Sequence, residues 1–196
     1  MNIIGITDIH GRRNYSPQVR EALQSADLVL CCGDLTDFGS AQDAERILQE
    51  IRLQNPNILS VSGNCDHPGV NTVLSASDIN LHNNTKSIGS VTCYGLGGSN
   101  PSPFHTPQEL GEDQIAGILK NYEKVKDSRW HVFVTHAPPA HTKVDRTFFR
   151  QHVGSRAVRA FIEEFRPDLV LCGHIHEARG SDTIDETIVI NPGPFP

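Results

Sequence analysis

The sequence lacks long apolar runs, an export signal and an excess of basic residues. Its apolar stretches extend over only a few residues, whereas a membrane-spanning helix needs about 20, so we expect no membrane insertion. The N-terminus does not show the basic-then-apolar layout of a signal peptide, and we therefore expect a cytoplasmic protein. Acidic residues outnumber basic ones by 23 to 17, and the formal net charge is −6. This balance disfavours a broad electrostatic contact with duplex nucleic acid, which needs clustered Lys and Arg.

Cysteine is also sparse, and no two cysteines are spaced as CxxC. The chain has five cysteines, of which Cys31, Cys32 and Cys172 stand at the ends of apolar runs. These positions favour small buried thiols in a reducing compartment over a disulfide framework. Of the 196 residues, 37% are apolar and 20% are charged, which is typical of a globular protein with a sizeable core. No linker or low-complexity tract divides the chain, so we predict one domain over residues 1–196.

Short runs rich in Val, Ile and Leu alternate with segments of helical period. This order is typical of an α/β domain with parallel strand pairs. Several of the strand runs are continuously apolar, as expected for strands that are covered on both faces. The predicted strands are residues 2–7, 28–32, 58–62, 87–94, 131–135, 169–172 and 187–190. The predicted helices are residues 17–26, 41–53, 70–75, 109–126 and 155–165.

Residues that can bind a metal follow most of the predicted strands. In α/β sheets, functional sites gather beyond the carboxyl ends of the strands, so we expect these residues to meet. In extended chain, residues i and i+2 point to the same side, which would aim Asp8 and His10 at one point, and likewise His174 and His176. The five segments are DIHG (8–11), GDLTD (33–37), GNCDH (63–67), THAPP (135–139) and GHIH (173–176).

Each of these segments alone is a weak signal. A single histidine is usually a surface or packed residue, and an aspartate after glycine usually forms a turn or a helix cap. Five strand-terminal segments in one chain favour a metal site over coincidence. Carboxylate, imidazole and amide ligands without thiolate suit Mn, Fe, Zn, Co or Ni better than a structural zinc site.

Taken in order, the segments DIHG, GDLTD, GNCDH, THAPP and GHIHEARG resemble the motifs of the calcineurin-like metallophosphoesterases. The likeness extends from Asp8 to Asn191-Pro192-Gly193, and it is greatest for the small single-domain phosphodiesterases of bacteria and archaea. It implies an α/β fold arranged as a four-layer α/β/β/α sandwich with mixed sheets. It also implies two divalent metal ions at the strand ends, with Mn favoured and Fe, Zn, Ni or Co as alternatives.

The resemblance also implies roles for seven residues. Asp34 would bridge the two ions, and Asp34, Asn64 and His136 would act in catalysis through the metals. A metal-bridging hydroxide would attack the phosphorus of a small phosphodiester, with phosphomonoesters as poorer substrates and a nucleotide as one candidate. One ion would be held by Asp8, His10 and His176, and the other by Asn64, His136 and His174.

The segment GNCDH departs from the family pattern at Cys65, where many members carry the histidine that protonates the leaving group. A thiol has an ordinary pKa near ~8.5 and is a poorer general acid around neutral pH. We expect Cys65 to fill space beside the metals, which leaves the general acid unassigned. Asp66 and His67 are expected to hold the loop or to orient a neighbouring histidine.

Two other functions are compatible with the same fold. A non-catalytic scaffold typically loses metal-binding histidines, whereas every ligand position is filled here. A nuclease would need the capping domain and basic surface that larger family members add. The loop 97–107 is either a connector or a lip over the site. Lys143, Arg146 and Arg150 either meet a second substituent of the substrate phosphate or remain solvated.

Overall fold

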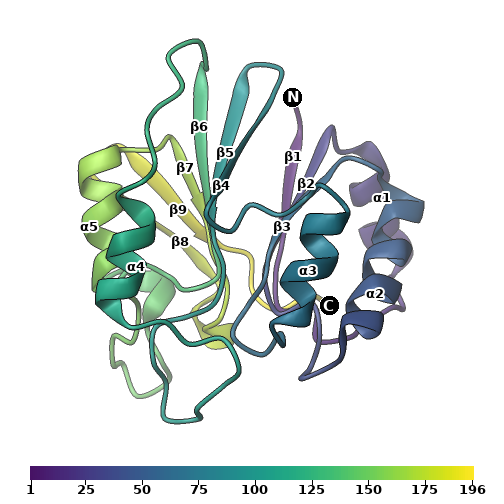
Figure 1. The fold of residues 1–196 in the computed structure, drawn as a ribbon, viewed down its shortest axis with the longest axis horizontal. Helices are drawn as coiled ribbons and strands as arrows, with labels where there is room; N and C mark the ends of the chain where they lie inside the picture. The colour runs from purple at the N-terminus through teal and green to yellow at the C-terminus, as the bar shows by residue number, and fades with distance from the viewer.

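Two β-sheets packed face to face form the centre of the molecule, and helices cover the outer face of each sheet (Figure 1). The computed structural model describes residues 1–196. The smaller sheet is parallel, in the order β1-β2-β3, and the larger is mixed, in the order β4-β5-β6-β7-β9-β8. The predicted α/β fold, in four layers and with a mixed sheet, is therefore confirmed. The strands are β1 (Ile3–Ile6), β2 (Leu28–Cys32), β3 (Ile58–Val61), β4 (Asn84–Ile88), β5 (Val91–Leu96), β6 (Trp130–Thr135), β7 (Leu169–Leu171), β8 (Gly180–Ile184) and β9 (Thr187–Asn191).

Each sheet shares a buried apolar cluster with its own helices. The cluster on the smaller sheet includes Leu23, Ile47 and Leu74, and the cluster on the larger sheet includes Phe133 and Phe161. The helices on the smaller sheet are α1 (Pro17–Ser25), α2 (Ala41–Gln54) and α3 (Gly69–Ala76). Those on the larger sheet are α4 (Glu112–Leu119) and α5 (Arg156–Phe165), and two short 3₁₀ helices, η1 (Lys143–Asp145) and η2 (His176–Ala178), lie in loops that follow β6 and β7.

Strand β2 shows why the two sheets pack together. All five of its residues are buried. Because successive side chains of a strand point to opposite faces, Leu28, Leu30 and Cys32 enter the core between the sheets, whereas Val29 and Cys31 face the helices. Full burial of a Leu side chain contributes about 1.5–3 kcal/mol. A continuously apolar strand therefore stabilises both layers at once.

Helix α2 begins where its capping residues predict. Ser40 Oγ accepts a hydrogen bond from the Asp43 amide, and the Asp43 carboxylate accepts one from the Ser40 amide. Such a cap contributes about 1 kcal/mol. Apolar residues at helical spacing, including Ile47 and Leu48, are buried against the smaller sheet. This start leaves residues 33–39 as a loop between β2 and α2, and the loop carries Asp34.

Two predicted elements are wrong in extent. The predicted strand 87–94 is a hairpin of β4 and β5, which reverses at Gly89 with a φ of 58°. The predicted helix 109–126 is only Glu112–Leu119, because Tyr122 leaves the helix, donates its hydroxyl to the Gly95 carbonyl and packs its ring against Tyr94. The antiparallel strand β8 was not predicted, because its residues are mostly polar and exposed.

All five cysteines are free thiols, and Cys31, Cys32 and Cys172 are buried in the core as predicted, together with Cys93. Cys31, Cys32, Cys93 and Cys172 have no exposed surface, whereas Cys65 is half-buried. None of the helices is both long and apolar enough to span a membrane.

We expect the half-buried thiol of Cys65 to react slowly with an aromatic disulfide reagent in the native protein, and the four buried thiols to react only after denaturation. Burial raises the pKa of the Cys31 and Cys93 thiols to about 12, so neither forms the reactive thiolate. Thiol counts with and without denaturant measure this difference. The variant Cys65→Ala should show no reactive thiol in the native state, and a thiol that still reacts in it would contradict this packing.

Candidate metal centre

The seven predicted ligands all follow strands whose carboxyl ends lie at one edge of the two sheets, the lower edge in Figure 1. Within each sheet these strands are parallel. The loop after each strand therefore opens onto the same edge. β1 leads to Asp8 and His10, β2 to Asp34, β3 to Asn64, β6 to His136, and β7 to His174 and His176.

Three side chains form the first candidate metal group: Asp8, His10 and His176. Asp8 Oδ1 lies 3.3 Å from His176 Nε2, and the Nε2 atoms of His10 and His176 are 3.2 Å apart. One ligand atom from each residue lies within 4.8 Å of the others. Ligand atoms that surround one ion at about 2.0–2.2 Å have separations of this size.

Asp34 connects this group to a second one. Its Oδ2 atom lies 3.8 Å from His10 Nε2 and 3.4 Å from His136 Nε2. Ligand atoms of Asp8, Asp34 and His136 lie within 4.8 Å of one another, and so do those of His10, Asp34 and Cys65. Asp34 therefore lies between His10 and His136, one histidine from each expected ion site.

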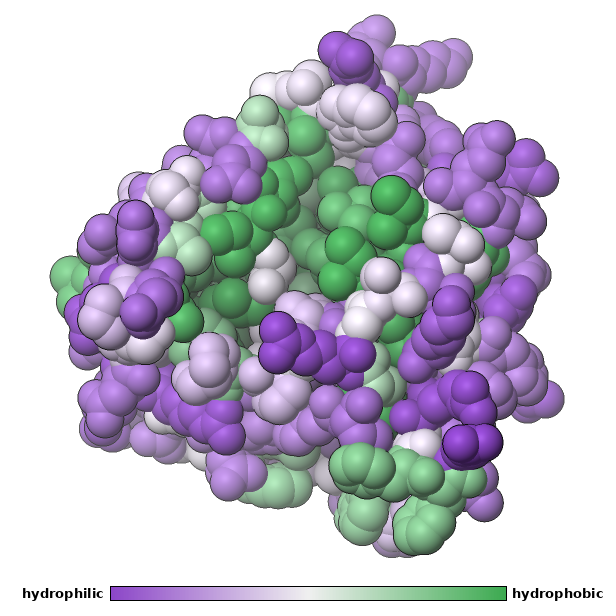
Figure 2. All heavy atoms as spheres, turned by 180° about the vertical axis from the view of Figure 1, so that it is seen from behind, coloured by the Kyte–Doolittle hydropathy of each residue, from purple (hydrophilic) through white to green (hydrophobic).

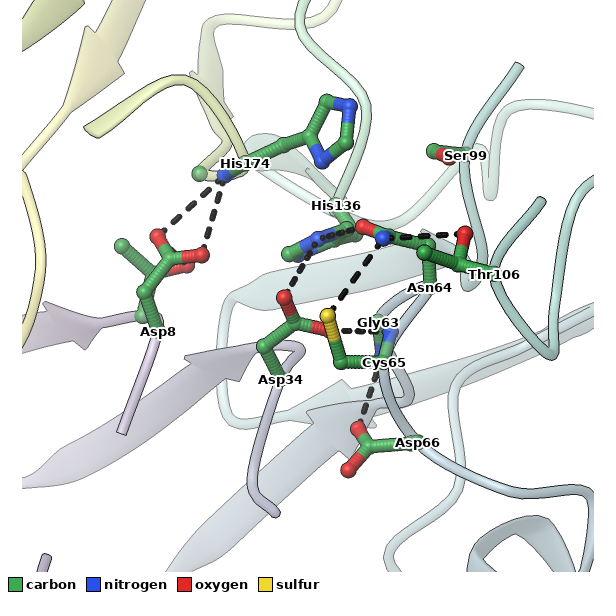
Figure 3. A network of polar contacts seen from close by, with 12 residues as sticks. Asp8, Asp34, Gly63, Asn64, Cys65, Asp66, Ser99, Thr106, His136 and His174 are labelled. Carbon is green, nitrogen blue, oxygen red and sulfur yellow. Dashed lines mark hydrogen bonds and ion pairs between the residues drawn. The ribbon is translucent and has the colours of Figure 1, made fainter. Parts of the chain in front are cut away.

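His174 is placed differently from the other predicted ligands. Its backbone amide donates to both carboxylate oxygens of Asp8, at 3.2 Å each. Its ring is directed away from Asp8 (Figure 3) and lies 5.1 Å from the His136 ring, measured between centroids. The ring belongs to none of the groups whose ligand atoms lie within 4.8 Å. The structure thus brings six predicted ligands together and holds the seventh beside His136.

Left-handed backbone turns aim these side chains. Asp8, His10, Asp34 and His174 have positive φ angles between 46° and 70°, which Asp and His adopt more readily than most residues but at a cost of about 1–3 kcal/mol. Asp8 and His10 do converge, as predicted, but the predicted cause is wrong, because the backbone at both residues is left-handed and not extended. The turns let the amides of Asp8 and His10 donate to the carbonyls of Gly33 and Asp34, at 3.1 and 3.0 Å.

Two glycines allow the loops to approach this closely. Gly33 has a φ of 94°, and a Cβ atom at that position would lie 2.6 Å from His136 Nδ1. A Cβ atom on Gly63 would collide with the carboxylate and amide of Asp34. A side chain at Gly33 would therefore push the loop that carries Asp34 away from His136, and one at Gly63 would push it away from the loop that carries Asn64.

His136 is fully buried, and its two ring nitrogens have different partners. Nδ1 lies 2.8 Å from the Cys32 carbonyl and donates to it, whereas Nε2 lies 2.8 Å from Asn64 Oδ1. Burial lowers the pKa of His136, but the charge of Asp34 outweighs it and raises the pKa to about 9. Burial acts to raise the pKa of Asp34, but the charge of His136 holds that pKa well below its ordinary value.

Acceptor atoms are crowded around this ring. His136 Nδ1 donates its proton to the Cys32 carbonyl, so Nε2 is left facing the oxygens of Asn64 and Asp34. All three atoms are acceptors unless Nε2 is protonated, and a proton or a cation between them would remove their mutual repulsion. The charge of Asp34, which raises the pKa of His136, favours a positive charge at this nitrogen. A carboxylate, an amide oxygen and an imidazole nitrogen suit divalent ions such as Mn or Fe. The residues present therefore fit a metal ion.

A chain of hydrogen bonds from the loop 97–111 orients the Asn64 amide. The Glu109 carboxylate accepts from the Thr106 amide and hydroxyl, at 2.9 and 2.8 Å. The Thr106 oxygen is left to accept from Asn64 Nδ2, at 3.1 Å, which directs Asn64 Oδ1 at His136 (Figure 3). The loop is therefore a wall of the site rather than a plain connector. Sequence reasoning missed both residues, although Thr-x-x-Glu is a known capping pattern.

Asp66 holds two of the ligand-bearing loops together. Its buried carboxylate accepts four hydrogen bonds, at 2.8–3.1 Å, from the amides of Gly63, Leu35 and Thr36 and from the Thr36 hydroxyl. The donors belong to the loops after β2 and β3, so one side chain fixes the spacing of both. The Asp66 carboxylate makes no hydrogen bond to a histidine, so of the two expected roles only loop holding is confirmed. His67 is exposed and outside the site.

Cys65 lies at the edge of the centre. Its amide donates to Asp34 Oδ1 at 2.8 Å, and its sulfur shares a candidate metal group with His10 and Asp34. Burial and the charge of Asp34 raise the pKa of the Cys65 thiol well above its ordinary value. The raised pKa favours the protonated thiol beside Asp34, and the backbone amide of Cys65 orients one carboxylate oxygen of Asp34.

The sequence model of the calcineurin-like phosphoesterase family matches residues 1–178. The uncharacterised protein MJ1162 of Methanocaldococcus jannaschii is 40% identical over 198 positions, which cover 99% of this chain and 88% of that protein. The chain therefore belongs to the calcineurin-like phosphoesterase family. Members of this family typically bind divalent metal ions, and the clusters described above are candidate ligand groups for such ions.

Solved structures share the fold at low sequence identity. One crystal structure aligns with a TM-score of 0.82 at 20% identity, over 98% of this chain and 90% of the other. The crystal structure of TT1561 of Thermus thermophilus aligns with a TM-score of 0.71 at 19% identity, over 98% of this chain and 88% of that chain. The arrangement of the two sheets is therefore common to these proteins.

We expect Thr106→Val to weaken metal binding, because the Asn64 amide would lose the acceptor that directs its oxygen inward. Removal of such a partner typically lowers metal affinity about 10–100-fold. Calorimetric titration of metal-free protein with Mn²⁺ measures the change. Thr106→Ser keeps the hydroxyl and should retain the wild-type affinity. Equal affinities for wild type and Thr106→Val would show that Asn64 does not depend on Thr106.

Proposed function

We propose that the protein is a metal-dependent phosphoesterase that holds two divalent ions, Mn foremost, and hydrolyses small phosphodiesters, with phosphomonoesters as poorer substrates. Residues 1–196 would act as one catalytic domain. The observation that carries the proposal is the convergence of two buried carboxylates, Asp8 and Asp34, with histidines from separate strands. Membership of the calcineurin-like phosphoesterase family supports the reaction class.

The proposed ligands come from both sheets. Asp34 would contact both ions, since it lies between His10 and His136. When bound, two such ions lower the pKa of water, which supplies a nucleophile near neutral pH, and offset the charge that builds on the phosphoryl oxygens. The first ion would be held by Asp8, His10 and His176, and the second by Asn64, His136 and His174.

The chain itself orients these donors before any ion binds. The Cys32 carbonyl accepts from His136 Nδ1 and so turns Nε2 into the site. The loop 97–111 turns the oxygen of Asn64 in the same direction. The Cys65 amide holds one oxygen of Asp34 and leaves the other directed at His136. Because these three donors are already in place, little rearrangement of His136, Asn64 and Asp34 would accompany binding.

The cysteine at position 65 supports a preference for esters whose leaving groups are acidic. The protonated thiol of Cys65, with its raised pKa, is a poor proton donor to a departing alkoxide. Esters whose leaving groups are acidic need no such proton. The filled set of ligand positions supports catalysis over a non-catalytic scaffold of the same fold.

A metal-free sample prepared with a chelator should be inactive towards bis-p-nitrophenyl phosphate and should regain activity with Mn²⁺. Asp34→Asn should abolish turnover and weaken binding of both ions, because it removes charge at the residue between the two groups. Release of nitrophenol and calorimetric titration with Mn²⁺ measure the two effects.

Asp185→Asn is the matched control, since Asp185 is exposed in the turn between β8 and β9. It should keep the wild-type rate and stoichiometry. Full activity of a rigorously metal-free sample would refute the proposed function. A near-normal rate for Asp34→Asn with two ions bound would refute the bridging role alone.

Cys65→His should raise the rate for poor leaving groups more than for nitrophenol. General acid catalysis typically contributes about 10²–10⁴-fold, and only alkoxide leaving groups such as sugar hydroxyls need it. The comparison uses a nitrophenyl diester and a dinucleoside phosphate, both at saturating Mn²⁺, because residue 65 adjoins the proposed ligand Asn64.

Cys65→Ala serves as the control for the space that the thiol fills, and it should cost little activity on nitrophenyl diesters. A large loss of activity in Cys65→Ala with both ions bound would assign a chemical role to the thiol.

A further inference from the structure

An open groove of about 430 Å³ is lined in part by Glu177, Ala178 and Arg179, which directly follow the candidate ligand His176. One wall is formed by η1 and the residues after it, and the other by η2, which begins at His176. Four cationic side chains line the groove, and Glu177 is its only acidic residue. The cations are Lys143, Arg146, Arg150 and Arg179.

The loop that carries three of these cations is held in a fixed shape. At its centre the buried Asp145 carboxylate accepts from His152 Nδ1 at 2.7 Å and from the amides of Thr142 and Gly154, at 2.9 and 3.1 Å. The Glu177 carboxylate accepts from the Phe148 amide at 3.2 Å. This last bond ties the tip of the loop to the residue after His176, so the groove has a fixed position relative to the metal centre.

The cations in the groove have few partners within the protein. The guanidinium groups of Arg146, Arg150 and Arg179 are exposed, and none of them makes a hydrogen bond or an ion pair with another residue. Lys143 Nζ lies 3.8 Å from Asp182, but its side chain is 76% exposed, so this pair is weak. A planar guanidinium binds phosphate oxygens with two parallel hydrogen bonds. Three unpaired guanidinium groups in one groove of an acidic protein therefore fit an anion that is not part of the chain.

Two aromatic rings stand at the tip of the same loop. Phe148 and Phe149 are consecutive in sequence, and 85% and 88% of their surfaces are exposed, so they contribute nothing to the core. Figure 2 shows apolar side chains gathered at its lower right, beside strongly hydrophilic ones, at the end of the molecule where the strand-end loops lie. Basic residues interleaved with exposed aromatic rings are typical of surfaces that bind single-stranded nucleic acid, because bases stack on the rings.

We propose that this groove binds the part of a short single-stranded oligonucleotide that extends beyond the cleaved linkage. Arg146 and Arg150 would hold the next phosphate, and Phe148 or Phe149 would stack against its base. The inference rests on the proposed phosphodiesterase function, since it places the scissile phosphate at the metal centre. A substrate with a single phosphate leaves the groove empty. The fixed position of the groove beside His176 favours a substrate extension over an anionic membrane surface.

The first experiment compares diadenosine monophosphate with the same dinucleotide carrying a further phosphate at its 5′ or 3′ end. Wild type should prefer one phosphorylated form, as a higher kcat/KM. Arg146→Gln/Arg150→Gln should bring the ratio of the two kcat/KM values towards one. The control Lys126→Gln/Arg129→Gln removes the same charge before β6, at the opposite ends of the strands, and should keep the wild-type ratio. A ratio of one in wild type, or an unchanged ratio in the groove variant, would overturn the proposal.

The second experiment measures binding without turnover. Fluorescein-labelled hexathymidylate is titrated with protein in chelator, and anisotropy is followed at several salt concentrations. Each phosphate contact that is lost should reduce the slope of log affinity against log salt by about 0.7, and Phe148→Ala/Phe149→Ala should weaken binding by about five- to 150-fold if one base stacks.

Vesicles that contain anionic phosphatidylserine provide the competing surface. If the groove and ring variants lose vesicle binding but keep hexathymidylate binding, the groove serves a membrane and the proposal is wrong. Hydrolysis of bis-p-nitrophenyl phosphate by wild type distinguishes a failure of the proposed phosphodiesterase function from a failure of the proposed groove. Its absence counts against the proposed function, whereas its presence with no effect of the groove variants counts against this site alone.

Discussion

Two buried carboxylates held close together are the constraint on which the rest of the structure depends. Burial and the charge of Asp34 both act to raise the pKa of Asp8, and the hydrogen bond from His176 and the charge of His136 overcome them. Such a pair persists only where its surroundings hold it in place. The left-handed turns, the glycines at the strand ends and the Asp66 carboxylate all serve this purpose, because each fixes a loop that carries one of the charges.

The layered fold makes this arrangement predictable from sequence to a large extent. Continuously apolar runs such as residues 28–32 favour strands covered on both faces, and their alternation with helical segments implies parallel pairing. Polar residues directly after such strands must then meet at one edge. For this reason the convergence of Asp8, Asp34 and His136 follows from their positions in the sequence.

What could not be predicted depends on contacts between residues distant in the chain. The hairpin at Gly89 and the early end of α4 follow from strand pairing and from Tyr122 packing against Tyr94, which no local pattern contains. The hydrogen bonds from Glu109 through Thr106 to Asn64 join segments more than 40 positions apart. Periodicity reports which face of an element is buried, but it does not report which loop comes to lie against another.

The centre also lies across the boundary between the two sheets. No strand of one sheet pairs with a strand of the other, and the sheets meet through apolar side chains. At the edge, a few polar contacts cross the boundary, among them the bond from His136 to the Cys32 carbonyl and that from the His174 amide to Asp8. An ion bound by residues of both sheets would cross-link the two halves of the molecule, and its binding free energy would add to their association. The metal centre would then also stabilise the fold, and the rigidity of the two packed sheets would depend on whether ions are bound there.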